Sequence, residues 1–208
     1  MRRLFLPIWA AQYAERFYGQ VFENMYSHSM TSPVNTRIAR AQMFAREAHD
    51  SIKQVRKYTG KPYWTHTEAV AKTVAEVGGS EDMVIAALLH DTVEDLPREI
   101  CNLGMIYDLF FARVRDMVED LTDVFTSTAY PGWNRANRKA AEAARLGRIS
   151  SESATIKLAD CLDNGKDIMS NDTNFGKVYI QEMKYLLPFL RHGNAQLFGQ
   201  LATFLHQN

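Results

Sequence analysis

The sequence predicts an all-α fold, and three observations support this prediction. Apolar residues recur at three- and four-residue steps along most of the chain, which is typical of amphipathic helices. No segment alternates apolar and polar residues with the period of two expected of a half-buried strand. Clusters of glycine, proline and asparagine separate the helical segments from one another. The chain has 208 residues, of which 46% are hydrophobic, so it can bury one full core.

Aromatic residues dominate the N-terminus, and some of them recur at four-residue steps along one face of a helix. These residues are Trp9, Tyr13 and Phe17. Turn-forming residues near Pro33 then interrupt the pattern. We therefore expect a helical extension over residues 1–34 and a main domain over residues 35–208. An aromatic stripe of this kind usually packs in a core or an interface, so the extension is a candidate contact between the subunits of a homo-oligomer.

The first two helices of the main domain are separated by a basic loop. The apolar spacing predicts a helix over about residues 36–49, and the glycine and proline of residues 52–64 predict a loop. Thr65 is placed to cap the next helix, with Glu68 at the spacing of a capping box. The glycine pair at 78–79 ends that helix.

A third helix carries the most informative stretch of the chain. Ser80 is placed to cap it, and its apolar residues continue to His90. Pro97 then breaks or kinks the chain. Helical patterns resume over residues 99–103 and 106–124.

The second half of the chain continues the same alternation of helices and breaks. Pro131 and Gly132 predict a loop, and Ser150 is placed to cap a helix that continues past Leu162. The expected elements are a loop over 126–133, a helix over 134–146, a helix from about 150, a loop over 171–174, and helices over 178–190 and 195–206.

The chain is organised around an apolar run, Ala86–Leu89, that ends in His90 and Asp91. Two more carboxylates follow at Glu94 and Asp95. In a helix, Asp91, Glu94 and Asp95 share one face, where three like charges repel each other. A bound cation would relieve this repulsion, although the same pattern also fits a helix that simply meets solvent.

Four side chains are candidate ligands of a transition metal, and they come from three predicted helices. They are His66, His90, Asp91 and Asp160. Asp160 lies among apolar residues such as Ile156 and Leu158, where an unpaired carboxylate is costly to bury. Each residue alone also fits an ordinary structural role, but two imidazoles and two carboxylates together suit a divalent metal.

The order of these residues resembles the signature of HD-domain metal-dependent phosphohydrolases. The neighbouring residues resemble the ppGpp hydrolase branch of the RelA/SpoT family, above all its stand-alone small alarmone hydrolases. The resemblance covers about residues 37–190. The matching segments are Ala45–His49, Gly60–His66, Ala86–Asp95, Val118–Asp123, Arg138–Lys139 and Lys157–Asp160 with Asn164.

The resemblance implies an HD-domain helical bundle and a role for each matching residue. His66, His90, Asp91 and Asp160 would bind one Mn²⁺ ion. Glu94 and Asp95 would position or activate the attacking water, as their chemistry also allows. The residues expected to bind substrate are Arg56, Lys57, Asn164 and Lys166. Arg138 joins them as a basic side chain suited to phosphate.

Several positions depart from the family pattern, among them Thr67, which follows His66 where relatives commonly carry proline, and a loop after Lys57 that is one residue longer. Asp163 stands where relatives usually carry histidine or tyrosine, and Cys161 stands where they carry arginine or lysine. These departures leave the metal ligands intact and affect the pocket for the base.

The function expected from the resemblance is metal-dependent removal of the 3′-pyrophosphate of ppGpp or pppGpp, the alarmones of the stringent response. One alternative is the same chemistry on another nucleotide, such as ppApp or the 2′-phosphate of NADPH. A second alternative is a nucleotide-binding regulator without turnover.

Composition limits the other partners. Lysine plus arginine and aspartate plus glutamate each number 24, so no global basic field indicates nucleic acid. No apolar run approaches the roughly 20 residues of a membrane span. Only Cys101 and Cys161 are present, which favours a reducing compartment, and we expect a cytoplasmic location.

Overall fold

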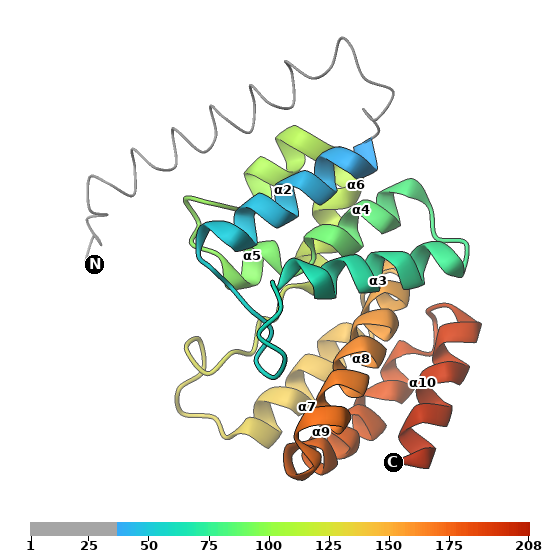
Figure 1. Cartoon of the computed structure of the whole chain (residues 1–208). Helices are drawn as coiled ribbons and strands as arrows, with labels where there is room; N and C mark the ends of the chain where they lie inside the picture. The colour runs from blue at the N-terminus through green and yellow to red at the C-terminus, as the bar shows by residue number, and fades with distance from the viewer. Residues whose placement is uncertain (1–36) are drawn as a thin grey trace.

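The computed structural model of the protein describes residues 37–208, and it confirms the all-α prediction (Figure 1). Within this range the structure contains helices and one isolated antiparallel bridge between Val55 and Pro62. The helices are α2 (Arg37–Ser51), α3 (Trp64–Glu76), α4 (Glu81–Leu89), α5 (Thr92–Asp95), α6 (Leu103–Leu121), α7 (Arg135–Leu146), α8 (Ser151–Asn171), α9 (Thr173–Leu186), the 3₁₀ helix η2 (Leu187–Leu190) and α10 (Ala195–Gln207). The predicted aromatic extension and the domain boundary after residue 34 lie outside the described residues.

Helix α4 forms the centre of the fold, because other helices surround it. It packs against α2, α3, α6 and α8. Six of its nine residues are buried: Met83, Ile85, Ala86, Ala87, Leu88 and Leu89. A helix that is apolar on nearly every side is stable only inside a protein. The end of α4 is therefore fixed by the core.

Helix α8 is the second long internal helix. It packs against α3, α4, α6, α9 and α10 and so links the first and second halves of the chain. In Figure 1, α2, α4 and α6 lie on one side of α3, and α7–α10 lie on the other side. Residues on α3, α4 and α8 consequently meet in the interior.

Most helix starts follow local sequence signals. The side chains of Ser80, Asn134 and Ser150 accept hydrogen bonds from backbone N–H groups in the first turns of α4, α7 and α8. These caps satisfy donors that a helix leaves without partners at its start. Their positions agree with the predicted starts.

The predicted cap of α3 is wrong. The helix begins at Trp64, and Thr65 Oγ1 donates a hydrogen bond to the carbonyl of Pro62 instead of capping. Glu68 accepts hydrogen bonds from Gln42 and Arg46 of α2, so it does not reach back to close a capping box. A tertiary contact has replaced the local one.

Two other predicted boundaries are wrong. The predicted helix over 99–103 is absent: residues 98–100 form a turn closed by the carbonyl of Pro97, and α6 begins at Leu103 after the cap Asn102. The predicted loop over 171–174 is reduced to Asp172, whose side chain caps α9. Helix α9 therefore begins five residues earlier than the expected residue 178.

Helix α6 contains a kink at Phe111, which has φ of 74°. The carbonyl of Phe110 accepts a hydrogen bond from Arg37 Nη2, at 3.2 Å. A side chain from α2 thus satisfies a backbone group at the interruption. Among the described residues, no helix has the length and apolar character needed to cross a bilayer.

We predict opposite effects of alanine at two glycines. Gly78 has φ of +81°, so Gly78→Ala should lower the free energy of unfolding by about 1 kcal/mol through backbone strain. Gly199 is exposed within α10 with open space beside its Cα, so Gly199→Ala should raise that free energy by about 1 kcal/mol. Urea unfolding followed by circular dichroism measures both, and equal shifts in the same direction would contradict the explanation.

Candidate metal centre

The four predicted metal ligands come together where three long helices meet. His66 lies in the first turn of α3, and His90 follows the last residue of α4. Asp91 precedes α5, and Asp160 lies in the middle of α8. His66, His90 and Asp160 are each at most 5% exposed.

The side-chain atoms of this cluster face one another. His66 Nε2 lies 3.2 Å from Asp160 Oδ1 and 3.6 Å from Asp91 Oδ2. His90 Nε2 lies 3.1 Å from Asp91 Oδ2 and 3.7 Å from Asp160 Oδ1. One ligand atom from each of His66, His90 and Asp91 lies within 4.8 Å of the others. The distances suit four groups arranged around one small cation.

The two inner histidine nitrogens are buried without a hydrogen-bond partner among the described residues, and this fits a metal site. The outer nitrogens are occupied: His90 Nδ1 lies 2.8 Å from the carbonyl of Ala87, and His66 Nδ1 lies 2.7 Å from Asp163 Oδ2. Because both of these oxygens only accept, each Nδ1 carries a proton, and a neutral ring then presents an Nε2 lone pair to the centre. Two lone pairs and two carboxylates form a donor set suited to a divalent cation.

The electrostatics of the cluster also favour a bound positive charge. Burial opposes a charge on His66 and His90, but the surrounding carboxylates outweigh burial and raise the pKa of both rings. Burial opposes ionisation of Asp160, but Lys157 and the two histidines outweigh burial and lower its pKa. In this arrangement protons and a metal ion compete for the same imidazole nitrogens.

Contacts around the ligands hold them in place, and three of the residues involved were absent from the predicted site. Tyr63 donates a hydrogen bond to Asp91 Oδ2 at 2.7 Å, and Lys157 Nζ lies 2.9 Å from Asp160 Oδ2. Asp163 holds His66 as described above. Tyr63 and Lys157 stand inside the matching motifs, and Asp163 was noted only as a departure, so spacing alone did not reveal their roles.

Glu94 and Asp95 lie on α5, directly after the ligand Asp91. A backbone hydrogen bond from Asp95 N to Asp91 O joins α5 to the ligand Asp91. Glu94 Oε2 accepts a hydrogen bond from the backbone N–H of Asp123 at 2.8 Å. Burial, followed by the charge of Asp123, raises the pKa of Glu94 to about 7. A carboxyl group with this pKa can take or hold a proton near neutral pH.

A cavity of about 150 Å³ opens beside Asp160. Lys139, Lys157 and Asn164 contribute to its lining, together with Asp123, which interacts with Lys139. Asn164 also donates a hydrogen bond to Asp160 Oδ1 at 2.7 Å. The cavity therefore places two cations and an amide beside the metal ligands.

The other predicted substrate residues lie in different surroundings. Arg138 donates a hydrogen bond to the carbonyl of Trp133 and does not line the cavity, whereas its neighbour Lys139 does. Lys166 is exposed on α8. Lys57 is exposed on the loop before α3 and lies over the ring of Tyr58.

Arg56 is held by two carboxylates of α8. Its Nη1 lies 2.7 Å from Asp163 Oδ2, and its Nη2 lies 3.1 Å from Asp167 Oδ2. Its side chain is 10% exposed. These ion pairs fasten the loop that precedes α3 to α8, and Asp163 joins Arg56 to His66.

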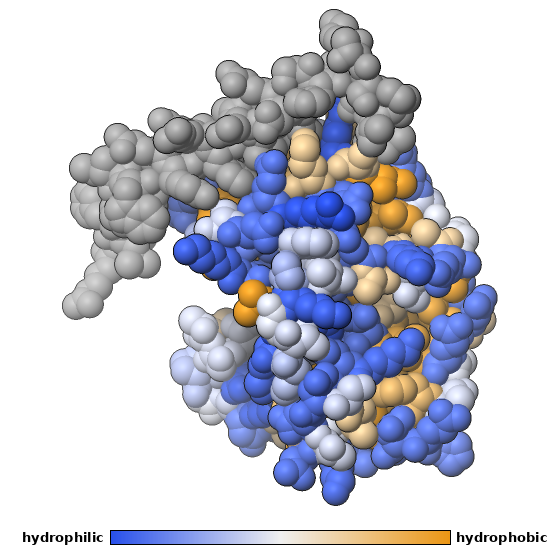
Figure 2. Space-filling view, in the orientation of Figure 1, coloured by the Kyte–Doolittle hydropathy of each residue, from blue (hydrophilic) through white to orange (hydrophobic). Residues whose placement is uncertain are grey.

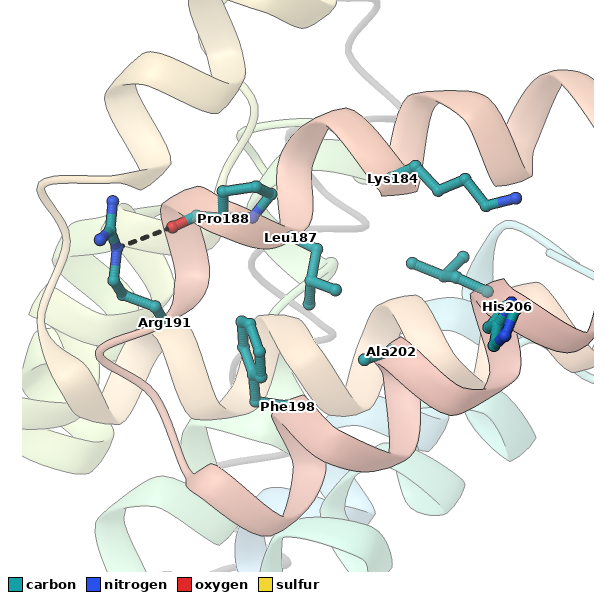
Figure 3. Close-up of a pocket in the computed structure, with 8 residues that line it drawn as sticks. Lys184, Leu187, Pro188, Arg191, Phe198, Ala202 and His206 are labelled. Atoms are coloured by element: carbon teal, nitrogen blue, oxygen red, sulfur yellow. Dashed lines mark hydrogen bonds between the residues drawn. The ribbon is translucent and has the colours of Figure 1, made fainter.

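The molecule also has a larger groove of about 500 Å³ between α9, η2 and α10 (Figure 3). Its floor is apolar, with Leu187, Phe198 and Ala202, and Lys184 and His206 stand at one end. It contains no residue of the metal cluster.

In the space-filling view, hydrophilic side chains cover most of the described surface that faces the viewer (Figure 2).

Comparisons with known proteins show which family this chain resembles. Residues 41–184 match the HD domain family. The guanosine-3′,5′-bis(diphosphate) 3′-pyrophosphohydrolase MESH1 of Xenopus tropicalis is 35% identical over 135 residues, which cover 63% of this chain and 69% of that protein. A solved structure described as a metazoan ortholog of SpoT that hydrolyses ppGpp has a TM-score of 0.72 and 26% identity. It covers 85% of this chain and 97% of its own. These matches confirm the family resemblance predicted from the motifs.

Some relatives are much longer than this chain. The guanosine-3′,5′-bis(diphosphate) 3′-pyrophosphohydrolase of Aquifex aeolicus is 36% identical over 135 residues, which cover 63% of this chain but 18% of that protein. The matching part of this chain spans about a fifth of the length of such long relatives, which come from Aquifex aeolicus, Synechocystis and rice.

We predict that Asp163 controls metal affinity through His66. The substitution Asp163→Asn removes the charge beside His66 Nδ1, and loss of such an outer partner weakens metal binding by about 10- to 100-fold. Calorimetric titration with Mn²⁺ measures the change. Asp167→Asn is the matched control, because Asp167 also pairs with Arg56 but makes no hydrogen bond or ion pair with a histidine of the cluster within residues 37–208. Similar affinities for the two variants would argue against this role.

Proposed function

Because the chain belongs to the HD domain family, we propose that it is a metal-dependent hydrolase that removes the 3′-pyrophosphate of ppGpp or pppGpp. The observation that carries this proposal is the pair of unpartnered histidine nitrogens facing Asp91 and Asp160, with Glu94 and Asp95 alongside. The products are GDP or GTP and pyrophosphate. The names of the similar proteins support this substrate class.

The metal in this proposal is a single Mn²⁺ ion held by His66, His90, Asp91 and Asp160. Two nitrogen and two oxygen donors suit this ion as well as Fe²⁺ or Zn²⁺. When bound, the ion supplies positive charge that polarises a phosphoryl oxygen and lowers the pKa of water.

In this proposal Glu94 takes the proton of the attacking water, and Asp95 orients that water. Water oxygen forms a bond to the phosphorus attached to the 3′-oxygen, and the bond between that oxygen and phosphorus breaks. Glu94 accepts the proton of the water, since burial and Asp123 raise its pKa to about 7. Asp95 orients the same water. The proton then returns to the departing 3′-oxygen or to solvent.

The phosphates of the substrate would lie in the cavity beside Asp160. Lys139 and Lys157 line it and supply positive charge, and Asn164 supplies an amide. The carboxylates of Asp123, Glu142, Asp160 and Glu182 line the same cavity, so the phosphates would lie against the two lysines and away from these groups. In this proposal, the outer phosphates or the nucleoside are contacted by Arg138, Lys166 and Lys57.

One observation favours keeping other nucleotides as a second candidate. Arg56, which the family resemblance assigns to the base, is paired with Asp163 and Asp167. A guanidinium held in this way has less freedom to stack on guanine. The same chemistry on ppApp or on the 2′-phosphate of NADPH is therefore the alternative. A cytoplasmic location accords with the free cysteines Cys101 and Cys161.

We predict that the purified protein with Mn²⁺ releases pyrophosphate from ppGpp. Glu94→Gln keeps the shape of the side chain but removes the base, so kcat should fall by about 100- to 10,000-fold. Chromatography of the nucleotide products measures both rates. His90→Ala should lose the metal-dependent rate entirely.

The substrate panel includes ppApp and NADPH beside ppGpp. Turnover of ppApp or NADPH alone would refute the guanosine assignment while leaving the hydrolase intact. Absence of a metal-dependent product from every nucleotide would refute the enzyme and favour a binding protein.

We also predict a pH profile governed by Glu94. Its carboxylate must be free to accept a proton, and its pKa is raised to about 7. The value of kcat/KM should therefore fall about tenfold per pH unit below 7 and level off above it. Initial rates between pH 5.5 and 8.5 measure this profile. The residual activity of Glu94→Gln should lack the acidic limb, and an unchanged limb would assign it to another group.

A further inference from the structure

A buried histidine outside the metal cluster is connected to Asp95 through one glutamine. His49 lies in the last turn of α2 and is 0% exposed. Its Nδ1 lies 2.6 Å from Gln54 Oε1, and Gln54 Nε2 donates a hydrogen bond to Asp95 Oδ2 at 2.8 Å. His49, Gln54 and Asp95 thus form a continuous chain of hydrogen bonds that leads to a catalytic carboxylate.

The chemistry of the groups sets the direction of both hydrogen bonds. An ionised carboxylate only accepts, so the amide nitrogen of Gln54 must face Asp95. The amide oxygen then faces His49, and this oxygen also only accepts. His49 Nδ1 must therefore carry the proton. The amide of Gln54 is fixed in one of its two orientations because both of its ends have partners.

The backbone of Gln54 is fixed as well. Gln54 N donates a hydrogen bond to the carbonyl of His49, and Gln54 O accepts one from Tyr63 N, both at 3.0 Å. The ring of His49 lies 5.0 Å from the ring of Tyr63, which binds Asp91. The histidine and the glutamine therefore belong to a rigid wall of the site.

The other ring nitrogen of His49, Nε2, is buried and lacks a hydrogen-bond partner among the described residues. Packing alone does not explain a histidine here, since an apolar side chain of similar volume would avoid a buried acceptor without a partner. The hydrogen bond from Nδ1 to Gln54 is the contact that such an apolar residue cannot make.

We propose that His49 and Gln54 are positioning residues that hold Asp95 in the orientation needed for hydrolysis. The N–H of Gln54 occupies Oδ2 of Asp95 and leaves Oδ1 for the attacking water. His49 prevents the amide from rotating to present its oxygen to Asp95. This inference rests on the proposed function, because it assigns a supporting role in the same reaction.

The test separates hydrogen bonding from packing at position 49. His49→Leu keeps an apolar side chain of similar size but lacks a donor. His49→Asn is smaller, yet its amide nitrogen takes the place of Nδ1 and can donate to Gln54. Gln54→Met keeps length and removes both polar atoms. His192→Leu is the matched control, because His192 is a partly buried histidine whose Nε2 lies 3.0 Å from the carbonyl of Ile149, remote from the site.

We expect kcat to fall by about tenfold or more in His49→Leu and Gln54→Met, which is the order of effect of losing an outer partner. KM and bound Mn²⁺ should stay within about twofold of the parent, since neither residue is a ligand. His49→Asn should recover most of kcat, and His192→Leu should retain it. In parallel, exchange of the Gln54 side-chain amide protons, followed by nuclear magnetic resonance, should accelerate in His49→Leu and remain slow in His49→Asn.

Several results would overturn the inference. Full activity in His49→Leu, or an Asn variant no better than the Leu variant, would show that His49 acts by packing or not at all. Loss of Mn²⁺ from the folded His49→Leu protein would assign His49 to the metal site instead. If the parent protein turns over no nucleotide, the proposed function fails, and the role in hydrolysis fails with it. Unchanged amide exchange in His49→Leu would separately exclude the structural link to Gln54.

Discussion

Two buried imidazole nitrogens, which have no hydrogen-bond partner in the described part of the chain and face two carboxylates, are the constraint on which the rest of the site depends. Buried polar atoms are costly unless they have partners, so the interior is stable only when protons or a cation complete this cluster. Ala87 and Asp163 occupy the outer nitrogens of the two rings and thereby aim the inner lone pairs at one point. Tyr63 and Lys157 hold the two carboxylates, Asp91 and Asp160, in place beside the same point.

The helical framework supports this arrangement by placing three of the four ligands, His66, His90 and Asp91, at the ends of helices. Helix α4 is surrounded by other helices and ends just before His90, and the chain then enters α5 with Glu94 and Asp95. The ligand pair and the acidic pair therefore lie next to each other without any long loop between them. Asp160 is the exception, since it lies in the middle of α8, and the ion pair with Lys157 offsets its burial. Hydrogen bonds from α2 and from the loop before α3 complete the wall around Asp95.

The helix caps that were predicted correctly depend only on neighbours in the chain. Ser80 and Ser150 cap their helices because a serine at a helix start reaches an N–H group within three residues. Thr65 carried the same local signal, yet it does not cap, because α3 begins at Trp64 and the Thr65 hydroxyl donates to the carbonyl of Pro62. Glu68 closes no capping box, because its carboxylate accepts hydrogen bonds from Gln42 and Arg46 on α2. Local signals fail where a partner from a distant part of the chain takes up the same group.

The sequence by itself determined the helical class, the order of the four candidate ligands and the acidic pair that follows them, because helical periodicity and ligand chemistry are written in residue type and spacing. Only the tertiary structure decided that Asp163 orients His66 across 97 positions of sequence, that Arg56 is fastened to α8, and that Lys139 instead of Arg138 lines the cavity. The physical reason is that these contacts depend on how α3 packs against α8 and how α7 packs against α9. A shift of a few ångströms between helices would change every one of these partners without changing any local pattern.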